Sequence, residues 1–367
     1  MTHILPVRVA SRHPAIAALV ALAALVAATL AAGPARAAAQ WQLAPVATRV
    51  EFRGLSLVGD HVAWASGARG TVARSTDGGA TWALHQVPGA DSLDLRSIVG
   101  LGPEVAVTAS AGPAENGQAK MYRTTDGGAT WTQVYTTHQK GVFLDAMAFW
   151  DADHGIVQSD PVDGTFFLLT TDDGGRHWTR VPPAALPPTL PGEAAFAASG
   201  TCITVWGTGD VWIGTGGGAR ARVFHSTDRG RTWTVSDTPV HAGGSAAGIF
   251  AVAFRDAMHG VAVGGDYTKP RGASVNVALT DDGGRSWRAA AGPLVPAYLS
   301  GVAWVNDGSL LMATGLAGTA LSRNAGAAWT LVDSVPMNAV RFNGRDFGVA
   351  VGPRGRLGRW GRFVDLN

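Results

Sequence analysis

The sequence predicts an all-β fold made of repeats of about fifty residues. A motif of the form S/T-x-D-x-G-x-T/S-W occurs six times, the last time in worn form. The tryptophans that end the copies are separated by 49, 47, 55, 54 and 42 residues. A period in this range indicates a repeat architecture, so each copy marks one repeating unit. The copies begin at Ser75, Thr124, Thr171, Ser226, Thr280 and Ser322.

Each copy of the motif has the composition of a hairpin turn between two short β-rich runs. The aspartate can accept hydrogen bonds from amides further round the turn, and the glycines allow positive φ. The tryptophan has a large apolar body to bury. One hairpin cannot cover its own apolar face, so the repeats must pack on one another. The structural turn residues expected at the third position are Asp77, Asp126, Asp173, Asp228, Asp282 and Asn324.

The motif resembles the Asp box of bacterial neuraminidase (BNR) repeats. In that family the box joins the third and fourth strands of a β-propeller blade. The resemblance therefore implies a propeller of four-stranded antiparallel blades, in the scaffold class that sialidases share. The box is a structural turn in that family, so the resemblance implies no chemistry at these aspartates.

Counting strands around the turns predicts seven blades. Six sets of four strands fall within 50–87, 93–136, 144–181, 194–235, 247–290 and 299–333, and the fourth set opens with one long strand over 194–206. The tail supplies three more strands, near 338–342, 347–351 and 355–360. Residues 41–45 can complete the seventh blade and close the ring, because Trp41 precedes Trp82 by 41 residues. Six or eight blades, or closure by residues 363–366, are the alternatives. No helix is expected in the propeller.

The amino terminus has the plan of a secretory signal peptide. Arg8, Arg12 and His13 precede an apolar run over 15–32, and Ala35-Arg36-Ala37 forms a small-residue cleavage site. Residues 1–37 are therefore expected to be removed, with cleavage after Ala37 or Ala39. An uncleaved anchor is the alternative, since about 18 apolar residues can just span a bilayer. Cleavage leaves residues 40–367 as one propeller domain, periplasmic or secreted, with no transmembrane span.

Charge and cysteine content exclude several classes of function. Residues 1–37 hold three arginines and no acidic residue, so the remainder has 26 basic against 27 acidic side chains and a net charge of −1. No dense basic stretch occurs, which argues against a nucleic-acid partner. Cys202 is the only cysteine, so an exported form has no internal disulfide. Its apolar strand context predicts a buried, inert thiol rather than a nucleophile.

The loops of blades three to five contain the unusual polar residues. Propeller geometry places the repeated turns on one face, and the second-to-third and fourth-to-first strand loops on the other, around the channel mouth. Function is often located on such loops when a rigid scaffold holds them. We expect a monomer that binds a protein partner on this face, with solvated loop charges as the alternative interpretation. The candidate binding residues are Asp145, Asp160, Asp163, Glu193, Arg220, Arg222, Asp266 and Tyr267.

Three specific chemistries have weaker support. Residues 214–218 are glycine-rich, but no helix follows them and the dinucleotide spacing is absent, so no cofactor is expected. No metal site is expected either: His154 and His259 belong to different blades, and two carboxylates do not fill a calcium shell. A glycosidase could use Glu193, Tyr298 and Arg53, as sialidases use a tyrosine nucleophile with a partner acid. The F/Y-R-I-P motif of sialidases is absent, since the chain has Arg53-Gly54-Leu55.

Residues 52–56 and 64–67 resemble the start of the photosystem II stability/assembly factor-like propellers, and the resemblance covers most of residues 41–360. It implies an exported, non-enzymatic scaffold that binds protein partners, including a role in assembling an envelope or membrane complex. The long loops at 182–193 and 264–274 depart from the photosynthetic pattern. The alternative function is a glycan-active or glycan-binding propeller, so whether the protein is an enzyme stays open.

Overall fold

A computed structural model describes residues 1–3, 41–295, 297–305 and 308–361. The predicted signal peptide and its cleavage sites, beyond the first three residues, lie outside the described residues, as does the alternative closing strand at 363–366. Within the described part of the chain, no helix is long and apolar enough to cross a membrane.

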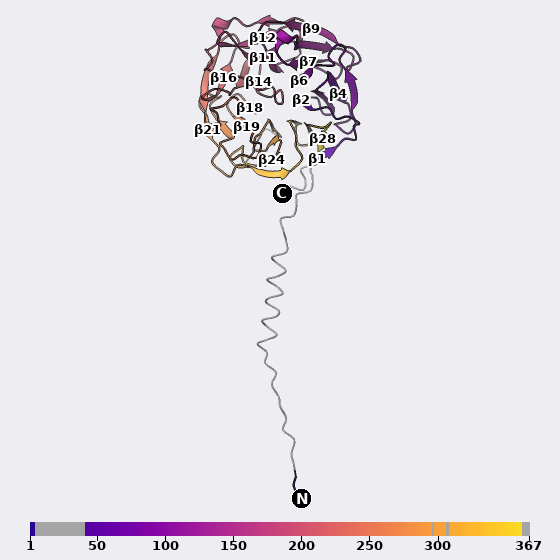
Figure 1. Cartoon of the computed structure of the whole chain (residues 1–367), viewed down its shortest axis with the longest axis vertical. Coiled ribbons are helices and arrows are strands. Elements are labelled where there is room, and N and C mark those ends of the chain that lie inside the picture. The colour runs from indigo at the N-terminus through magenta and orange to yellow at the C-terminus, as the bar shows by residue number, and fades with distance from the viewer. Residues whose placement is uncertain (4–40, 296, 306–307, 362–367) are drawn as a thin grey trace. The chain divides into compact units, whose positions relative to one another are not determined.

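The chain from residue 41 onward forms seven four-stranded antiparallel sheets, arranged as the blades of a propeller (Figure 1). This confirms the predicted fold class. In each blade the first strand lies toward the middle of the ring, as β2, β6, β14 and β18 do in Figure 1. The described helices are two 3-10 turns, η1 (Ala114–Asn116) and η2 (Pro183–Ala185).

The strands follow the predicted order. Blades one to four are β2 (Phe52–Val58), β3 (Val62–Gly67), β4 (Thr71–Ser75), β5 (Ala83–Gln86); β6 (Asp94–Gly100), β7 (Ala106–Ala111), β8 (Ala119–Thr124), β9 (Thr132–Thr137); β10 (Leu144–Phe149), β11 (Gly155–Val162), β12 (Thr165–Thr171), β13 (Thr179–Arg180); β14 (Ile203–Trp206), β15 (Asp210–Gly214), β16 (Ala221–Ser226), β17 (Thr234–Thr238). Blades five to seven are β18 (Ala247–Phe254), β19 (Gly260–Asp266), β20 (Val277–Thr280), β21 (Arg288–Ala289); β22 (Gly301–Trp304), β23 (Leu311–Gly315), β24 (Gly318–Ser322), β25 (Thr330–Asp333); β26 (Ala339–Asn343), β27 (Phe347–Val351), β28 (Leu357–Trp360) and β1 (Trp41–Leu43).

The first described strand closes the ring, as the sequence predicts. β1 pairs antiparallel with β28, with Trp41 opposite Trp360, and so completes the seventh blade. The two indole rings meet edge to face, with their centroids 4.8 Å apart. The Trp41 indole Nε1 also donates to Thr319 Oγ1 at 2.8 Å, which ties blade seven to blade six. Two distant parts of the chain therefore share one blade.

The repeated turn is held by its own side chains. In the first copy, Asp77 accepts hydrogen bonds from the Thr81 amide at 2.9 Å and the Thr81 hydroxyl at 2.6 Å. These bonds stabilise the carboxylate, the hydroxyl bond most, and lower the pKa of Asp77 to about 2. The Trp82 indole donates back to the Gly79 carbonyl at 3.1 Å. The aspartates are thus occupied within the turn, as expected for a structural element.

The hydrophobic core lies between neighbouring blades. One cluster joins Ile156 and Phe166 of blade three to Ile213 and Phe224 of blade four. Another joins Phe52 of blade one to blade seven. Each sheet thus covers its apolar face with the next sheet, which is why a single hairpin cannot fold alone.

The one long strand predicted over 194–206 is wrong. Only β14 (Ile203–Trp206) is a strand, while Ala194 forms an isolated bridge with Gly216. The intervening residues leave the blade and cross the middle of the ring. Their apolar composition imitates a strand, but Gly200 has a φ of 66°, which ends an extended conformation. We call residues 194–200 the central segment.

The central segment contacts blades on the far side of the ring. Arg53 of blade one donates to the Ala198 carbonyl at 3.1 Å, and Arg96 of blade two donates to Ala197 at 3.4 Å. Ser199 Oγ donates to the Ser300 carbonyl of blade six at 2.6 Å. Because these partners come from three separate blades, the segment lies across the centre of the propeller.

Candidate functional site

A cavity of about 500 Å³ lies above the central segment. Residues from all seven blades or their adjoining loops line it. They belong to first strands, to the second strand of blade three, and to second-to-third and fourth-to-first strand loops. This is the face opposite the repeated turns. The lining residues that carry charged, amide or aromatic groups are Arg53, Arg96, Phe143, Asp145, Asp160, Phe196, Phe250, Tyr267, Tyr298 and Asn338.

β-Bulges supply half of this set. The pairing register shifts past a single residue in four first strands, and the residues passed over are Arg53, Arg96, Asp145 and Phe250. The second strand of blade three has the same irregularity at Asp160. A bulge leaves one residue out of the ladder and re-aims its side chain. All five residues line the cavity, so four of the bulges place a charged side chain there and the fifth places Phe250.

The two arginines of the cavity already have acidic partners. Arg53 pairs with Glu51 at 2.5 Å, and Arg96 pairs with Asp94 at 2.7 Å. Each arginine also holds a carbonyl of the central segment. The two arginines therefore hold the central segment, which lines the cavity, in place.

The two aspartates of blade three have no such partner. Asp145 is 1% exposed, and its Oδ2 accepts no hydrogen bond. Burial, followed by the neighbouring Asp160, raises the pKa of Asp145 well above its usual value. Asp160 accepts a hydrogen bond from the Ala195 amide at 3.0 Å, while burial raises its pKa to about 6. The pair therefore carries less negative charge than two exposed carboxylates at neutral pH.

Aromatic rings form the wall toward blades five and six. Phe196 of the central segment stacks on Phe250 with centroids 3.9 Å apart. Tyr298 and Tyr267 meet Phe250 edge to face at 4.7 and 6.2 Å. Tyr298 is 5% exposed and burial raises the pKa of its hydroxyl, whereas Tyr267 is 48% exposed. Tyr267 is thus the aromatic residue most open to a partner.

Asp160→Asn is expected to stabilise the fold at pH 7.5 by up to about 3 kcal/mol, with little effect at pH 4. A raised folded-state pKa means that the stability contributed by protonated Asp160 is present below pH 4 and lost as the pH rises through about 6. Asparagine keeps an oxygen for the Ala195 amide and cannot ionise. Denaturant midpoints of both proteins between pH 4 and 8 measure the difference. Asp237→Asn, at an exposed carboxylate, serves as the control, and a difference that does not change with pH would contradict the prediction.

The structure brings some of the predicted site residues together. Asp145, Asp160 and Tyr267, predicted for binding, share the cavity with Arg53 and Tyr298, predicted for a glycosidase. Glu193 and Arg222 do not line it. They form a bidentate ion pair in which the side chains are 0% and 9% exposed, and one of its bonds joins Arg222 Nε to Glu193 Oε1 at 2.9 Å. Glu193 therefore holds its own loop together.

The other predicted binding residues lie at separate places on the loops. Asp163 has a φ of 53° and precedes Gly164 in a tight hairpin turn, where Asp-Gly is favoured. Arg220 forms an exposed ion pair with Asp237 at 2.6 Å. Asp266 accepts a hydrogen bond from the Thr268 amide at 2.9 Å and pairs with Lys269 at 3.3 Å. None of these three residues contributes to the central cavity.

Sequence reasoning missed five of the lining residues: Arg96, Phe143, Phe196, Phe250 and Asn338. One signal was present in the strand patterns: Phe52-Arg53-Gly54, Leu95-Arg96-Ser97 and Leu144-Asp145-Ala146 each place a charged residue directly after an apolar one in the first strand. The charge occupies the same position in three successive blades. Phe250 gave no such signal, because an aromatic residue is common in a buried strand.

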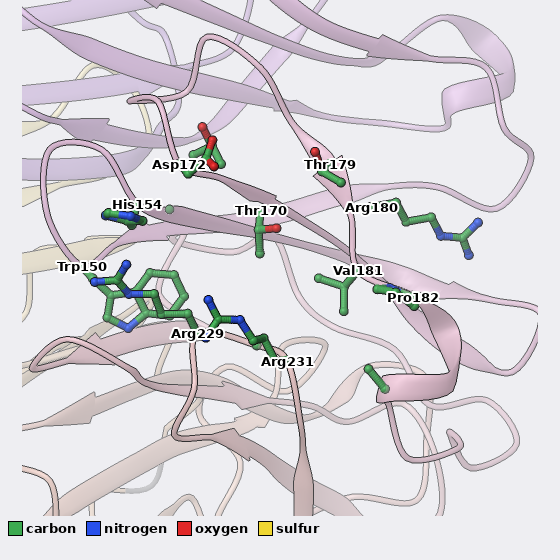
Figure 2. Close-up of a pocket in the computed structure, with 14 residues that line it drawn as sticks. Trp150, His154, Thr170, Asp172, Thr179, Arg180, Val181, Pro182, Arg229 and Arg231 are labelled. Carbon is green, nitrogen blue, oxygen red and sulfur yellow. The ribbon is translucent and has the colours of Figure 1, made fainter.

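A second cavity, of about 580 Å³, lies between blades three and four beside the repeated turns (Figure 2). Arg229 donates to the Thr208 carbonyl at 2.6 Å and approaches Asp151 at 3.6 Å. Arg180 points away from Arg229 and Arg231, and its guanidinium lies 4.6 Å from the Phe167 ring centre (Figure 2). The arginines therefore do not converge on one point.

Cys202, His154 and His259 each have a partner within the fold. Cys202 is buried and donates to Gln158 Oε1 at 3.3 Å, and burial raises the pKa of its thiol. His154 and His259 each bond, through Nδ1, to an aspartate three residues earlier, at 2.8 and 2.9 Å. These histidines brace equivalent turns in blades three and five.

Comparison with solved structures finds the same fold. A structure of YCF48 bound to D1 peptide superposes with a TM-score of 0.61 at 16% identity, covering 90% of this chain and 99% of that chain. YCF48 from Cyanidioschyzon merolae gives 0.61 at 17% identity, over 88% and 99%. U3-55K gives 0.60 at 15% identity, over 88% and 98%. No protein-family model and no curated protein matches the chain. At these identities the comparisons establish a shared propeller fold.

Proposed function

We propose that this protein is an exported, non-enzymatic propeller that binds a protein partner at the central cavity and assists assembly of an envelope complex. One observation carries the proposal: all seven blades contribute to a single cavity, into which bulges aim charged and aromatic side chains. The structure of YCF48 with a D1 peptide supports it, because a propeller of the same shape binds a peptide. The sequence of residues 1–37 supports export.

A glycan-active propeller is the second candidate. Arg53, Arg96 and Tyr298 line the same cavity as two carboxyl groups, which are the residue types that a sialidase site uses. The raised pKa of the Tyr298 hydroxyl opposes its use as a nucleophile. Glu193, the expected partner acid, is instead held by Arg222.

Photocrosslinking tests the proposed function. A photoreactive phenylalanine analogue at Tyr267 is expected to capture a protein from envelope extracts. The same analogue at Leu331, which is 43% exposed on an outer strand, is the matched control. Discrete products at Tyr267 alone support the proposal, whereas equal products at both positions, or none at Tyr267, contradict it. Turnover of a glycoside that Tyr298→Phe abolishes would establish the second candidate.

A further inference from the structure

We propose that the central cavity receives an alkylammonium group, the side chain of a lysine on the partner, between the carboxyl groups of Asp145 and Asp160. The inference rests on the proposed function and names the chemistry of its partner. Asp145 carries it, because this residue lines the cavity and its buried Oδ2 has no hydrogen-bond partner. A buried charge or polar atom is costly unless it is paired, so an unpaired one at a binding site indicates a missing ligand atom.

The charges of the cavity favour a cation. Arg53 and Arg96 are balanced by Glu51 and Asp94, whereas neither Asp145 nor Asp160 has an ion-pair partner among the described residues. The uncompensated groups are therefore acidic. An incoming ammonium has three donors, enough to reach both carboxyl groups and a backbone carbonyl of the wall.

The shape and lining of the cavity suit a long aliphatic stem. Tyr267 and Leu316, which are 48% and 39% exposed, stand at the cavity with Phe250 beneath. Lysine packs its methylene groups along apolar surface while its charge reaches a polar partner. A volume of about 500 Å³ leaves room for part of the partner's backbone as well.

A divalent metal fits less well. Calcium requires six to eight oxygens, and the described residues contain no group of three or more histidine, cysteine or acidic side chains placed to hold a metal ion. Two neighbouring carboxyl groups offer negative charge and enough acceptor oxygens for the three N–H donors of one ammonium.

Binding should strengthen as the pH rises, because a cation favours the ionised carboxylates. The titratable and charged groups around Asp145 are Asp160 on β11, Arg96 on β6 and Cys202 before β14. The Cys202 thiol stays protonated, since burial raises its pKa. The aspartate pair therefore governs the pH response.

NMR titration of the purified protein tests the inference. The probes are Nα-acetyl-lysine methylamide, its Nε-acetylated form, the arginine analogue, n-butylamine and calcium chloride. The lysine probe is expected to bind at least tenfold more tightly than the Nε-acetylated form, and more tightly at pH 7.5 than at pH 5. Butylamine binding as tightly as the lysine probe would support the ammonium site but indicate a free amine. A preference for the arginine analogue or for calcium would overturn the inference.

Matched variants separate loss of binding from misfolding. Asp145→Asn and Asp160→Asn are expected to weaken binding of the lysine probe at least tenfold while melting no lower than the wild type. Asp237→Asn, which removes an exposed carboxylate that does not line the cavity, should bind normally. Unchanged binding in Asp145→Asn would overturn the inference. If the partner still crosslinks at position 267 in the Asp145→Asn/Asp160→Asn protein, the proposed function stands and the lysine inference fails.

Discussion

Glu193→Ala is expected to lower the free energy of unfolding by about 3 to 5 kcal/mol, because it leaves the guanidinium of Arg222 buried without its counter-charge. The carboxylate has four donors: two nitrogens of Arg222, the Thr215 hydroxyl at 2.6 Å and the Leu190 amide at 2.8 Å. Among the described residues, the Arg222 guanidinium otherwise donates to the Pro188 carbonyl at 3.1 Å and lies 5.0 Å from the Phe224 ring centre. Urea denaturation at neutral pH measures the loss.

Two comparisons test the cause of this loss. Asp237→Ala breaks the exposed pair with Arg220 and should cost less than about 1 kcal/mol. Glu193→Leu combined with Arg222→Met should recover most of the stability, since apolar residues of similar size often replace a buried pair without loss. A loss below about 1 kcal/mol in Glu193→Ala would mean that water or a rearranged loop compensates Arg222.

This result also bears on function. Any loss of binding or turnover in a Glu193 variant must be corrected for the fraction of unfolded protein before Glu193 is assigned a catalytic role. A substitution of Arg222 should cause the same loss of stability, because the two side chains form one buried ion pair. Tyr267 and Asp145 do not share this complication: Tyr267 is half exposed, and Asp145 forms no hydrogen bond through Oδ2.

The blades could be predicted because their signal is local and repeated. Five of the six turns combine a hydroxyl, a carboxyl group, a glycine and a tryptophan within eight residues, and in the sixth Asn324 replaces the carboxyl group. Their hydrogen bonds close within the turn. Such a turn can be recognised from the sequence because its formation does not depend on contacts with distant residues. The position of Trp41 relative to Trp82 extended the same period to the closing strand.

The cavity could be predicted only in part because it depends on distant contacts. Residues 194–198 read as a strand, yet they lie across the ring because Arg53 and Arg96 bind their carbonyls from 145 and 101 residues away. The ion pair of Glu193 with Arg222 spans 29 residues and leaves no local pattern. The sequence predicts Asp160 from its loop and Asp145 from the beginning of a first strand on the same face. Their convergence depends on two bulges that polarity alone does not reveal.

Stability and binding oppose each other at the cavity. A regular strand would place an apolar or paired residue where Asp145 lies, and the fold would gain from its burial. The protein instead retains two carboxyl groups with raised pKa values. Natural sequences depart from local rules in this way mostly at functional sites. An asparagine variant of Asp145 or Asp160 that is more stable than the wild type but no longer binds would therefore show that these carboxyl groups are retained for binding.

Trp41→Ala is expected to lower the free energy of unfolding by about 3 to 5 kcal/mol, as truncation of a buried aromatic side chain does. Trp41 is 3% exposed, packs edge to face on Trp360 and donates to Thr319 of the preceding blade. Its backbone amide also donates to Asp333 at 3.2 Å. The substitution leaves a cavity where the first and last described strands, β1 and β28, pair. Denaturant midpoints, followed by tryptophan fluorescence, measure the effect.

Trp206→Ala is the matched control, because Trp206 ends an inner strand but is 41% exposed. Its loss should cost about 0.5 kcal/mol or less. Proteolysis distinguishes an opened ring from a general loss of stability. If the seventh blade closes the ring, Trp41→Ala should expose β1 and β28 to cleavage before the other blades, and the first fragments should end within them. Equal stability of the two variants, or cleavage that begins in another blade, would show that packing between the blades holds the ring without the closing strand.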